Sequence, residues 1–360
     1  MNRPTPFYDP SKSYQENYDQ GPFGLFAEEA SPFKRQGKPE HTFLGHAVFL
    51  PFGIPAGPLL NAKFVTAAFK QGFDICTYKT VRTRPHPCHP WPNVLAVHPE
   101  GKLVADRPEP LIADQIYDAP VSITNSFGVP SANPDIWQAD MQLALKSAGK
   151  GQVMIGSFQA TSDGSGSVKQ YIDDFVNAAK LVTETGAKIL EANLSCPNEG
   201  SAHLLCFDIE RTTQIAANIK EAIGNIPLIL KIAYFAEDKQ LETLVKNLAP
   251  IVDGFAAINT IPAAIVDATG EQALPGQGRL RSGVCGSAIQ WAGLEMTERL
   301  VAMRENLNLQ YTVIGVGGVT TAEDFTRYRA AGADAVQSAT GAMWNPDLAQ
   351  NIWKKQKESV

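Results

Sequence analysis

The segment from Asn193 to Asn198 reads Asn-Leu-Ser-Cys-Pro-Asn and gathers side chains that can do chemistry. Its thiol, Cys196, can remove a proton from a substrate if the thiol pKa is lowered or the substrate's acidity is raised. The two flanking amides offer donors and acceptors to a planar polar ligand. A lone cysteine at a strand end favours a buried structural thiol, but these neighbours favour a catalytic base.

Two lysines lie inside predicted buried strands, Lys79 at the end of 74–79 and Lys231 within 227–232. An unpaired buried charge is costly, so each lysine needs an anion or a polar partner. Two such lysines at one end of a barrel indicate an anionic ligand. Polar and flexible residues at other strand ends complete the candidate set: Asn125, Phe127, Gly128, Val129, Asn259 and Thr260.

Small residues follow the last two predicted strands, with Gly317 and Gly318 in one turn and Ala339 and Thr340 in the other. Backbone amides in the loops after strands seven and eight form the usual phosphate site of a (β/α)8 barrel. The amide of Gly286 is a candidate for the same site, whereas the neighbouring Cys285 thiol needs no role. Ordinary turns are the alternative.

These residues must be positioned by a rhythm of short β-rich runs and amphipathic helices, which is typical of parallel βαβ units. Helical spacing runs from Val168 to Val182 before Gly186, and again from Ala322 to Ala331 before Gly332. The run 162–167 is expected to be a loop that caps the first of these helices. Nine segments are candidate strands: 52–56, 74–79, 121–125, 152–157, 188–193, 227–232, 253–258, 311–315 and 334–338.

Because a (β/α)8 TIM barrel has eight strands, one candidate is surplus, and we remove 121–125. The Pro-rich stretch 81–118 before it has little helical pattern and predicts an excursion after strand 2. Residues 1–48 are expected to form an irregular N-terminal arm, with a disordered tail as the alternative, and residues 49–360 the barrel domain. A doubly wound sheet is the competing α/β fold, although no Gly-x-Gly-x-x-Gly follows the first strand.

Composition excludes several classes of protein. The 360 residues carry a net charge of −6, which provides no extended basic surface for nucleic acid. No run is long and apolar enough for a membrane span, so a cytoplasmic protein is expected. The five cysteines include no Cys-x-x-Cys pair and are expected to be free thiols. His86, Cys88 and His89 are separated by prolines and are not expected to bind a metal.

Taken together, the motifs resemble the dihydroorotate dehydrogenase family over about residues 50 to 345. The hexapeptide with Cys196 is the most specific of them, and the flavin-and-pyrimidine half of dihydropyrimidine dehydrogenase is also similar. The resemblance implies a (β/α)8 barrel that binds FMN and oxidises (S)-dihydroorotate to orotate in de novo pyrimidine synthesis. Cys196 would take the C5 proton and flavin N5 the C6 hydride, from opposite sides of one bond. A cysteine base is similar to the soluble class of the family.

The resemblance also assigns the binding residues. The substrate would be bound by Lys79, Asn125, Phe127, Gly128, Val129, Asn193, Asn198, Asn259 and Thr260. FMN would be bound by Ala56, Gly57, Lys79, Thr80, Asn193, Lys231, Asn259, Gly286, Gly317, Gly318, Ala339 and Thr340. Of these, Lys231 would lie near the N1 and O2 edge of the flavin, where a positive charge favours the reduced anionic form.

The chain departs from the family pattern at Ile54 and Pro55, at Ser131 and at Ala339, which affects flavin contacts and the phosphate turn. A flavoprotein that acts on another dihydropyrimidine therefore stays open, as does a barrel that only binds flavin or phosphate. A homodimer is expected. The electron acceptor could be fumarate, NAD through a partner, or another molecule.

Overall fold

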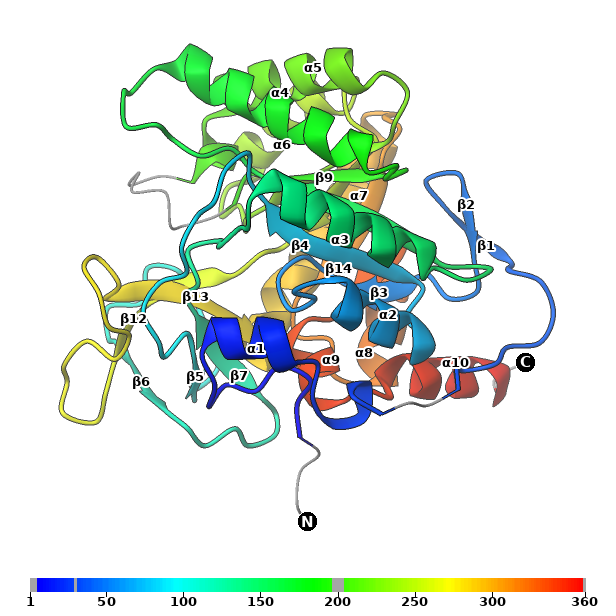
Figure 1. Ribbon diagram of the computed structural model, residues 1–360. Helices are drawn as coiled ribbons and strands as arrows, with labels where there is room; N and C mark the ends of the chain where they lie inside the picture. The colour runs from blue at the N-terminus through cyan, green and yellow to red at the C-terminus, as the bar shows by residue number, and fades with distance from the viewer. Residues whose placement is uncertain (1–4, 29–30, 196–203, 359–360) are drawn as a thin grey trace.

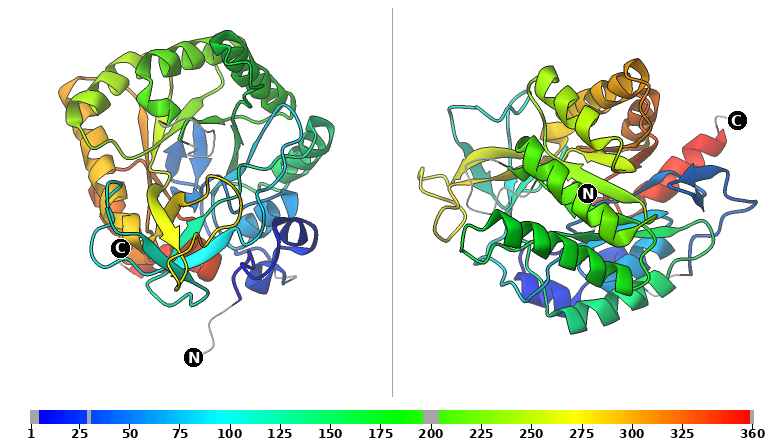
Figure 2. Two further views of the ribbon diagram at one scale, coloured as in Figure 1. Left: turned by 90° about the vertical axis from the view of Figure 1, so that its left-hand side faces the viewer. Right: turned by 90° about the horizontal axis from the view of Figure 1, so that it is seen from above.

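The structure is a computed structural model that describes residues 5–28, 31–195 and 204–358. Eight parallel strands close into a barrel, which Figure 1 shows from the side and Figure 2 from two further directions. They are β3 (Phe52–Ile54), β4 (Ile75–Val81), β8 (Val153–Phe158), β9 (Leu190–Asn193), β10 (Leu228–Ile232), β11 (Gly254–Ala257), β14 (Thr312–Val316) and β15 (Ala335–Gln337). Pairing of β15 with β3 completes the closure, so the doubly wound alternative is wrong.

Helices cover the outside of this barrel (Figure 2). They are α2 (Ala62–Lys70), α3 (Pro134–Lys146), α4 (Val168–Glu184), α5 (Ile209–Ile223), α6 (Asp238–Leu248), α7 (Gln290–Asn306), α8 (Ala322–Ala330), α9 (Thr340–Trp344) and α10 (Leu348–Glu358). The predicted starts of α4 and α8 are confirmed, and Ser167 caps α4 through a bond from the amide of Gln170. Gly186 and Gly332 follow the two helices with φ of 93° and 92°, conformations that favour glycine.

Five further strands form a second, smaller closed sheet. They are β5 (Val94–Val97), β6 (Leu111–Asp114), β7 (Ser122–Asn125), β12 (Ile261–Val266) and β13 (Arg281–Gly286). The surplus strand candidate is β7, which pairs with β5 and β13 and lies outside the main barrel, as predicted. β12 and β13 follow β11 in the chain and were not among the expected strands, yet they pair with β6 and β7, which follow β4.

Between residues 5 and 48 the described chain packs against the barrel at both ends. It contains α1 (Tyr14–Gln20), η1 (Gly24–Phe26), and a hairpin of β1 (His41–Phe43) and β2 (His46–Val48). Phe43 and Val48 of the hairpin are buried against the lowest inward-facing side chains of the barrel, among them Ile75 and Ile229. At the other end Phe7 is fully buried, and its amide donates to the Met343 carbonyl at 3.2 Å.

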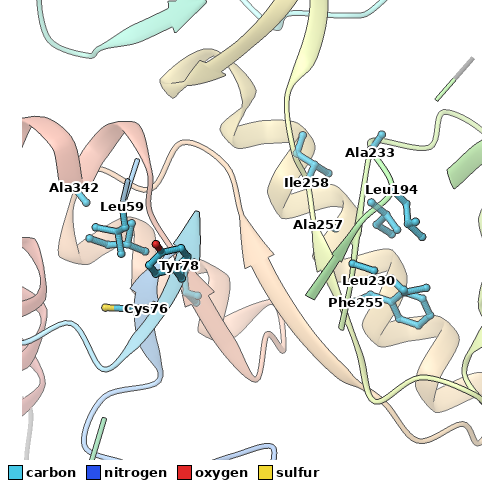
Figure 3. Close-up of a cluster of buried hydrophobic side chains, with 14 of the residues drawn as sticks. Leu59, Cys76, Tyr78, Leu194, Leu230, Ala233, Phe255, Ala257, Ile258 and Ala342 are labelled. Carbon is cyan, nitrogen blue, oxygen red and sulfur yellow. The ribbon is translucent and has the colours of Figure 1, made fainter. Parts of the chain in front are cut away.

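Alternate residues of each strand face the helices rather than the barrel axis. Figure 3 shows part of this outer core, in which Tyr78 of β4 lies beside Leu59, and Leu230 of β10 lies near Phe255 of β11. Burial of apolar surface stabilises a core by roughly 25 cal/mol per Å². This packing fixes the strands, and thereby the residues at their ends.

Candidate functional site

A cavity lies at the carboxyl ends of the barrel strands, enclosing about 1150 Å³ with its open mouth included. The structure brings fourteen of the predicted site residues to its lining: Ala56, Gly57, Lys79, Thr80, Asn125, Phe127, Gly128, Val129, Asn193, Lys231, Asn259, Thr260, Ala339 and Thr340. Gly286, Gly317 and Gly318 do not border it. Cys196 and Asn198 lie outside the described residues.

The asparagines at the ends of β9 and β11 are held in one hydrogen-bond network. Asn193 Nδ2 donates to Gln159 Oε1 at 2.7 Å, and Asn193 Oδ1 accepts from the Ser195 hydroxyl at 3.3 Å. Asn259 Nδ2 donates to the same hydroxyl at 3.0 Å. These bonds fix the orientation of both amides before any ligand arrives.

Both lysines are nearly buried and border the cavity. Lys79 Nζ lies 5.5 Å from the centroid of the Tyr14 ring, within cation–π range. Burial lowers the pKa of Lys231 to about 8, while the charge of Glu191 acts in the opposite direction. The cavity therefore presents two cationic groups below about pH 8, which suits an anionic ligand.

Cys285 borders the cavity as well, and its thiol, which was expected to need no role, takes part in two hydrogen bonds. Its Sγ accepts hydrogen bonds from Asn125 Nδ2 at 3.4 Å and from Thr340 Oγ1 at 3.3 Å. Burial raises the pKa of this thiol, so it stays neutral. Cys285 therefore orients the amide of Asn125 rather than acting as a nucleophile.

The three glycines that do not border the cavity come directly after two lining residues, Cys285 and Val316. A Cβ on Gly318 would stand 2.9 Å from the Gly286 carbonyl oxygen, and Gln290 Nε2 donates to the Gly318 carbonyl at 2.7 Å. Gly317 and Gly318 have φ of 136° and 63°. Only glycine allows this close backbone approach without strain.

The turn after β7 is braced by Arg82, a residue that the sequence analysis missed. Gly128 and Val129 have φ of 76° and 51°. Arg82 Nε donates to the Val129 carbonyl at 2.9 Å, and its Nη1 donates to the Ala160 carbonyl at 2.8 Å. Arg82 is 3% exposed, and no short motif in the sequence marks it as a brace.

The described N-terminal residues supply a second missed feature, an aromatic wall. Tyr8 and Tyr14 border the cavity, and both pack edge-to-face on Phe127, with ring centroids 5.6 and 6.1 Å apart. The Tyr8 hydroxyl is buried and has no hydrogen-bond partner within the described ranges. The aromatic residues between positions 7 and 18 were the one sign of this wall in the sequence, and they do not indicate which residues they contact.

His86 and His89, on either side of Cys88, are partly buried. Burial lowers the pKa of His86 to about 4, and that of His89 is lowered for the same reason. Among the residues that the structure describes, no group of three or more His, Cys, Asp or Glu side chains could hold a metal ion. His86 instead exchanges two backbone hydrogen bonds with Ser131.

The chain is similar to known proteins along most of its length. The family model described as dihydroorotate dehydrogenase matches residues 40–359. The chain belongs to the dihydroorotate dehydrogenase family. The family resemblance predicted from the motifs is therefore confirmed, and the protein is an oxidoreductase enzyme.

Among its relatives, a dihydroorotate dehydrogenase from Dictyostelium discoideum is 34% identical over 98% of each chain. A dihydroorotate dehydrogenase (quinone) from Clavibacter michiganensis is 27% identical over 83% of this chain and 78% of that protein. A catalytic subunit of dihydroorotate dehydrogenase B (NAD(+)) from Thermodesulfovibrio yellowstonii is 27% identical over 64% of this chain and 71% of its own.

A crystal structure of dihydroorotate dehydrogenase from Eimeria tenella, in complex with ferulenol, has the same fold. Its TM-score is 0.67 at 18% sequence identity, covering 88% of this chain and 83% of that one. None of the described helices is both long and apolar enough to cross a membrane.

Proposed function

We propose that the protein oxidises (S)-dihydroorotate to orotate in pyrimidine synthesis, with FMN as cofactor and Cys196 as the base. The observation that carries the proposal is a single cavity, in a chain of this family, that brings together two lysines and three asparagine amides. Orotate and dihydroorotate are anionic rings with carbonyl and N–H groups, which match this set of donors, acceptors and charges.

The residues present fit a flat cofactor with a phosphate group. Gly57 borders the cavity with φ of 133°, and a Cβ built there would meet no atom within 4 Å. A side chain at this position would therefore project into space that a ring can use. Ala56 and Gly57 would back the ring, and Lys231 would face it. Thr80 would be a further contact of the ring, and amides around Gly286, Gly317, Gly318, Ala339 and Thr340 would hold the phosphate.

When bound, FMN would supply a hydride acceptor at N5. The chain's own residues would do the rest. The amides of Asn125, Asn193 and Asn259, oriented by their hydrogen bonds, would hold the substrate ring in one pose. Lys79 would balance negative charge on the substrate. Cys196 would remove the proton at C5, and the aromatic residues around Phe127 would limit access of water.

Anaerobic mixing with dihydroorotate tests the proposal directly. The purified protein should be yellow, and dihydroorotate should bleach its visible flavin absorbance. We expect Cys196→Ala to slow the bleaching by roughly a hundred- to ten-thousand-fold, because a positioned base contributes that much. Rapid bleaching by the variant would show that Cys196 is not the base.

The same experiment separates the two alternatives. A yellow protein that is bleached by another dihydropyrimidine and not by dihydroorotate would change the substrate and keep the chemistry. A colourless protein that binds only phosphate would favour a non-catalytic barrel.

The acceptor is a separate question, because the relatives named above include enzymes described with quinone and with NAD(+). Reoxidation with fumarate, NAD(+) and a quinone would identify it. A cytoplasmic homodimer remains our expectation, which size-exclusion chromatography with light scattering would test for its oligomeric part.

A further inference from the structure

The inside of the barrel changes from apolar to polar along its axis. Ile75, Ile189 and Ile229 belong to one buried apolar cluster at the lower end of the barrel. Side chains two residues further along a strand face the same way. Those positions carry Thr77 on β4, Glu191 on β9 and Lys231 on β10, and we call these three side chains the polar layer. On β8 and β14 the corresponding residues, Ile155 and Val316, belong to the apolar cluster.

Glu191 is the unusual member of this layer. It has no solvent exposure, and neither carboxylate oxygen has a hydrogen-bond partner among the described residues. Ser157 on β8 stands opposite Glu191, and its hydroxyl, which lies 2.9 Å from Thr80 Oγ1, lowers the pKa of Glu191. Thr77 Oγ1 accepts from Gln337 at 3.1 Å. A buried carboxylate with so little hydrogen bonding is unfavourable unless an opposite charge compensates it.

Lys231 on the neighbouring strand supplies that charge. The pairing of β9 with β10 sets Asn193 opposite Lys231. Glu191 precedes Asn193 by two residues, so its side chain also faces the barrel axis, one step below that pair. Burial raises the pKa of Glu191 while the charge of Lys231 lowers it, and the reverse holds for Lys231. Each group thus favours the ionised form of the other.

Other charges do not explain the state of Lys231. The residues of β11, on the far side of β10, include no titratable side chain. Lys79 is the other cation in the described lining of the cavity, Cys285 is held neutral, and no described Asp or Glu borders the cavity. In the described part of the chain, Glu191 is the charge that acts on Lys231, and it acts from beneath the cavity.

We propose that Glu191 is a positioning residue whose buried carboxylate keeps the Lys231 ammonium charged beneath the bound ligand. The identity of that ligand as FMN rests on the proposed function, whereas the coupling between Glu191 and Lys231 does not. Glu191 itself borders no ligand space, so its effect reaches the ligand only through Lys231.

Competitive acetylation would measure the coupling. Full-length protein freed of any flavin is treated with acetic anhydride between about pH 6 and 10, and the peptides with Lys231 and Lys79 are quantified by mass spectrometry. Lys79 serves as the internal reference. The variants are Glu191→Gln, which removes the charge at constant size, and Thr77→Val, a matched change of a neutral residue in the same layer.

In the unsubstituted protein, the reactivity of Lys231 should have its midpoint near the pKa of about 8. A fall of about one pKa unit in Glu191→Gln would raise its reactivity at neutral pH roughly five-fold relative to Lys79. Thr77→Val should leave the ratio unchanged. An unchanged midpoint in Glu191→Gln, or an equal shift in Thr77→Val, would overturn the proposal.

Thermal unfolding gives a second route if Glu191→Gln folds poorly. Lys231→Met leaves the buried carboxylate without its counter-charge, so adding Glu191→Gln to that variant should raise its unfolding temperature. Absence of any gain would contradict the coupling. Addition of FMN tests the link to function: in Glu191→Gln the affinity for FMN should fall about two-fold at pH 7 and roughly five-fold at pH 8. A protein that binds no FMN at all would count against the cofactor and leave the acetylation result intact.

Discussion

The cavity has a polar wall and an aromatic wall, and the two are built differently. The polar wall is formed by Asn193, Lys231 and Asn259 at the ends of adjacent barrel strands, with amides fixed by hydrogen bonds of 2.7–3.3 Å. The aromatic wall joins Tyr8 and Phe127 from segments far apart in the sequence, through ring contacts. The first wall places charges and amides with precision, whereas the second provides shape and excludes water.

The largest effect is expected when a charge is removed from the polar wall. Lys231→Met should slow flavin reduction by dihydroorotate roughly a hundred-fold, because a fixed charge at a site of developing negative charge has effects of that size. Stopped-flow measurement of flavin bleaching would give the rate. Lys220→Met is the control, since Lys220 bonds to Asp253 and does not border the cavity. A similar loss in both variants would contradict a local role.

For the aromatic wall, the test is removal of Arg82, which supports the turn next to Phe127. Arg82→Met removes donors from buried carbonyls, so we expect the free energy of unfolding to fall by about 3 kcal/mol. The Michaelis constant for dihydroorotate should rise as the turn at Gly128 loosens. Denaturant titration and steady-state kinetics measure the two effects. Arg84→Met is the matched control: the side chain is 43% exposed, and its loss should cost less than about 0.5 kcal/mol.

A pH titration addresses the polar wall without substitution. A lysine with a pKa of about 8 is charged below that pH and neutral above it. Affinity for FMN should therefore vary little at lower pH and should fall by up to roughly ten-fold per unit above about pH 8. Isothermal titration calorimetry between about pH 6 and 9.5 would show this. The step should be missing in Lys231→Met; a step of equal size there would assign it to another group.

The smallest expected effect concerns the Tyr8 hydroxyl. Because it has no hydrogen-bond partner in the described structure, Tyr8→Phe should not destabilise the unliganded protein. If the hydroxyl bonds to a ligand, affinity for FMN or orotate should weaken about five- to ten-fold, which corresponds to roughly 1 kcal/mol. Tyr18→Phe, outside the cavity, provides the comparison. Equal affinities would mean that the aromatic wall acts through its shape alone.

The polar wall could be predicted from the sequence because its information is local. A strand end, an amide and a glycine stop lie within a few residues of one another, and parallel strands bring their carboxyl ends together. This is why the eight strands were found, whereas Ala56, Gly57 and Thr80 among the fourteen described lining residues came only from the family resemblance. Removal of 121–125 from the barrel was correct because the stretch before it, 81–118, has little helical pattern.

The aromatic wall could not be predicted, because its contacts are distant in sequence. Nothing near Arg82 indicates that it brackets Val129 and Ala160, and nothing near Tyr8 names Phe127 as its neighbour. The joining of β12 and β13 to β5–β7 is equally non-local. Glu191 lies two residues before the motif that begins at Asn193, yet only the structure showed that its carboxylate is buried and that its charge acts on Lys231.

The contact between Phe7 and Met343 has a consequence for synthesis of the protein. The ribosome makes Phe7 more than three hundred residues before Met343, and both belong to segments that border the cavity. The early segment can pack on Phe64 and Phe127 well before that, but its hydrogen bond to Met343 forms only after the late segment has emerged. Since Ala339, Thr340 and Met343 line the cavity, its wall is complete only when translation is almost finished, and a chain that stops before α9 would present an incomplete cavity.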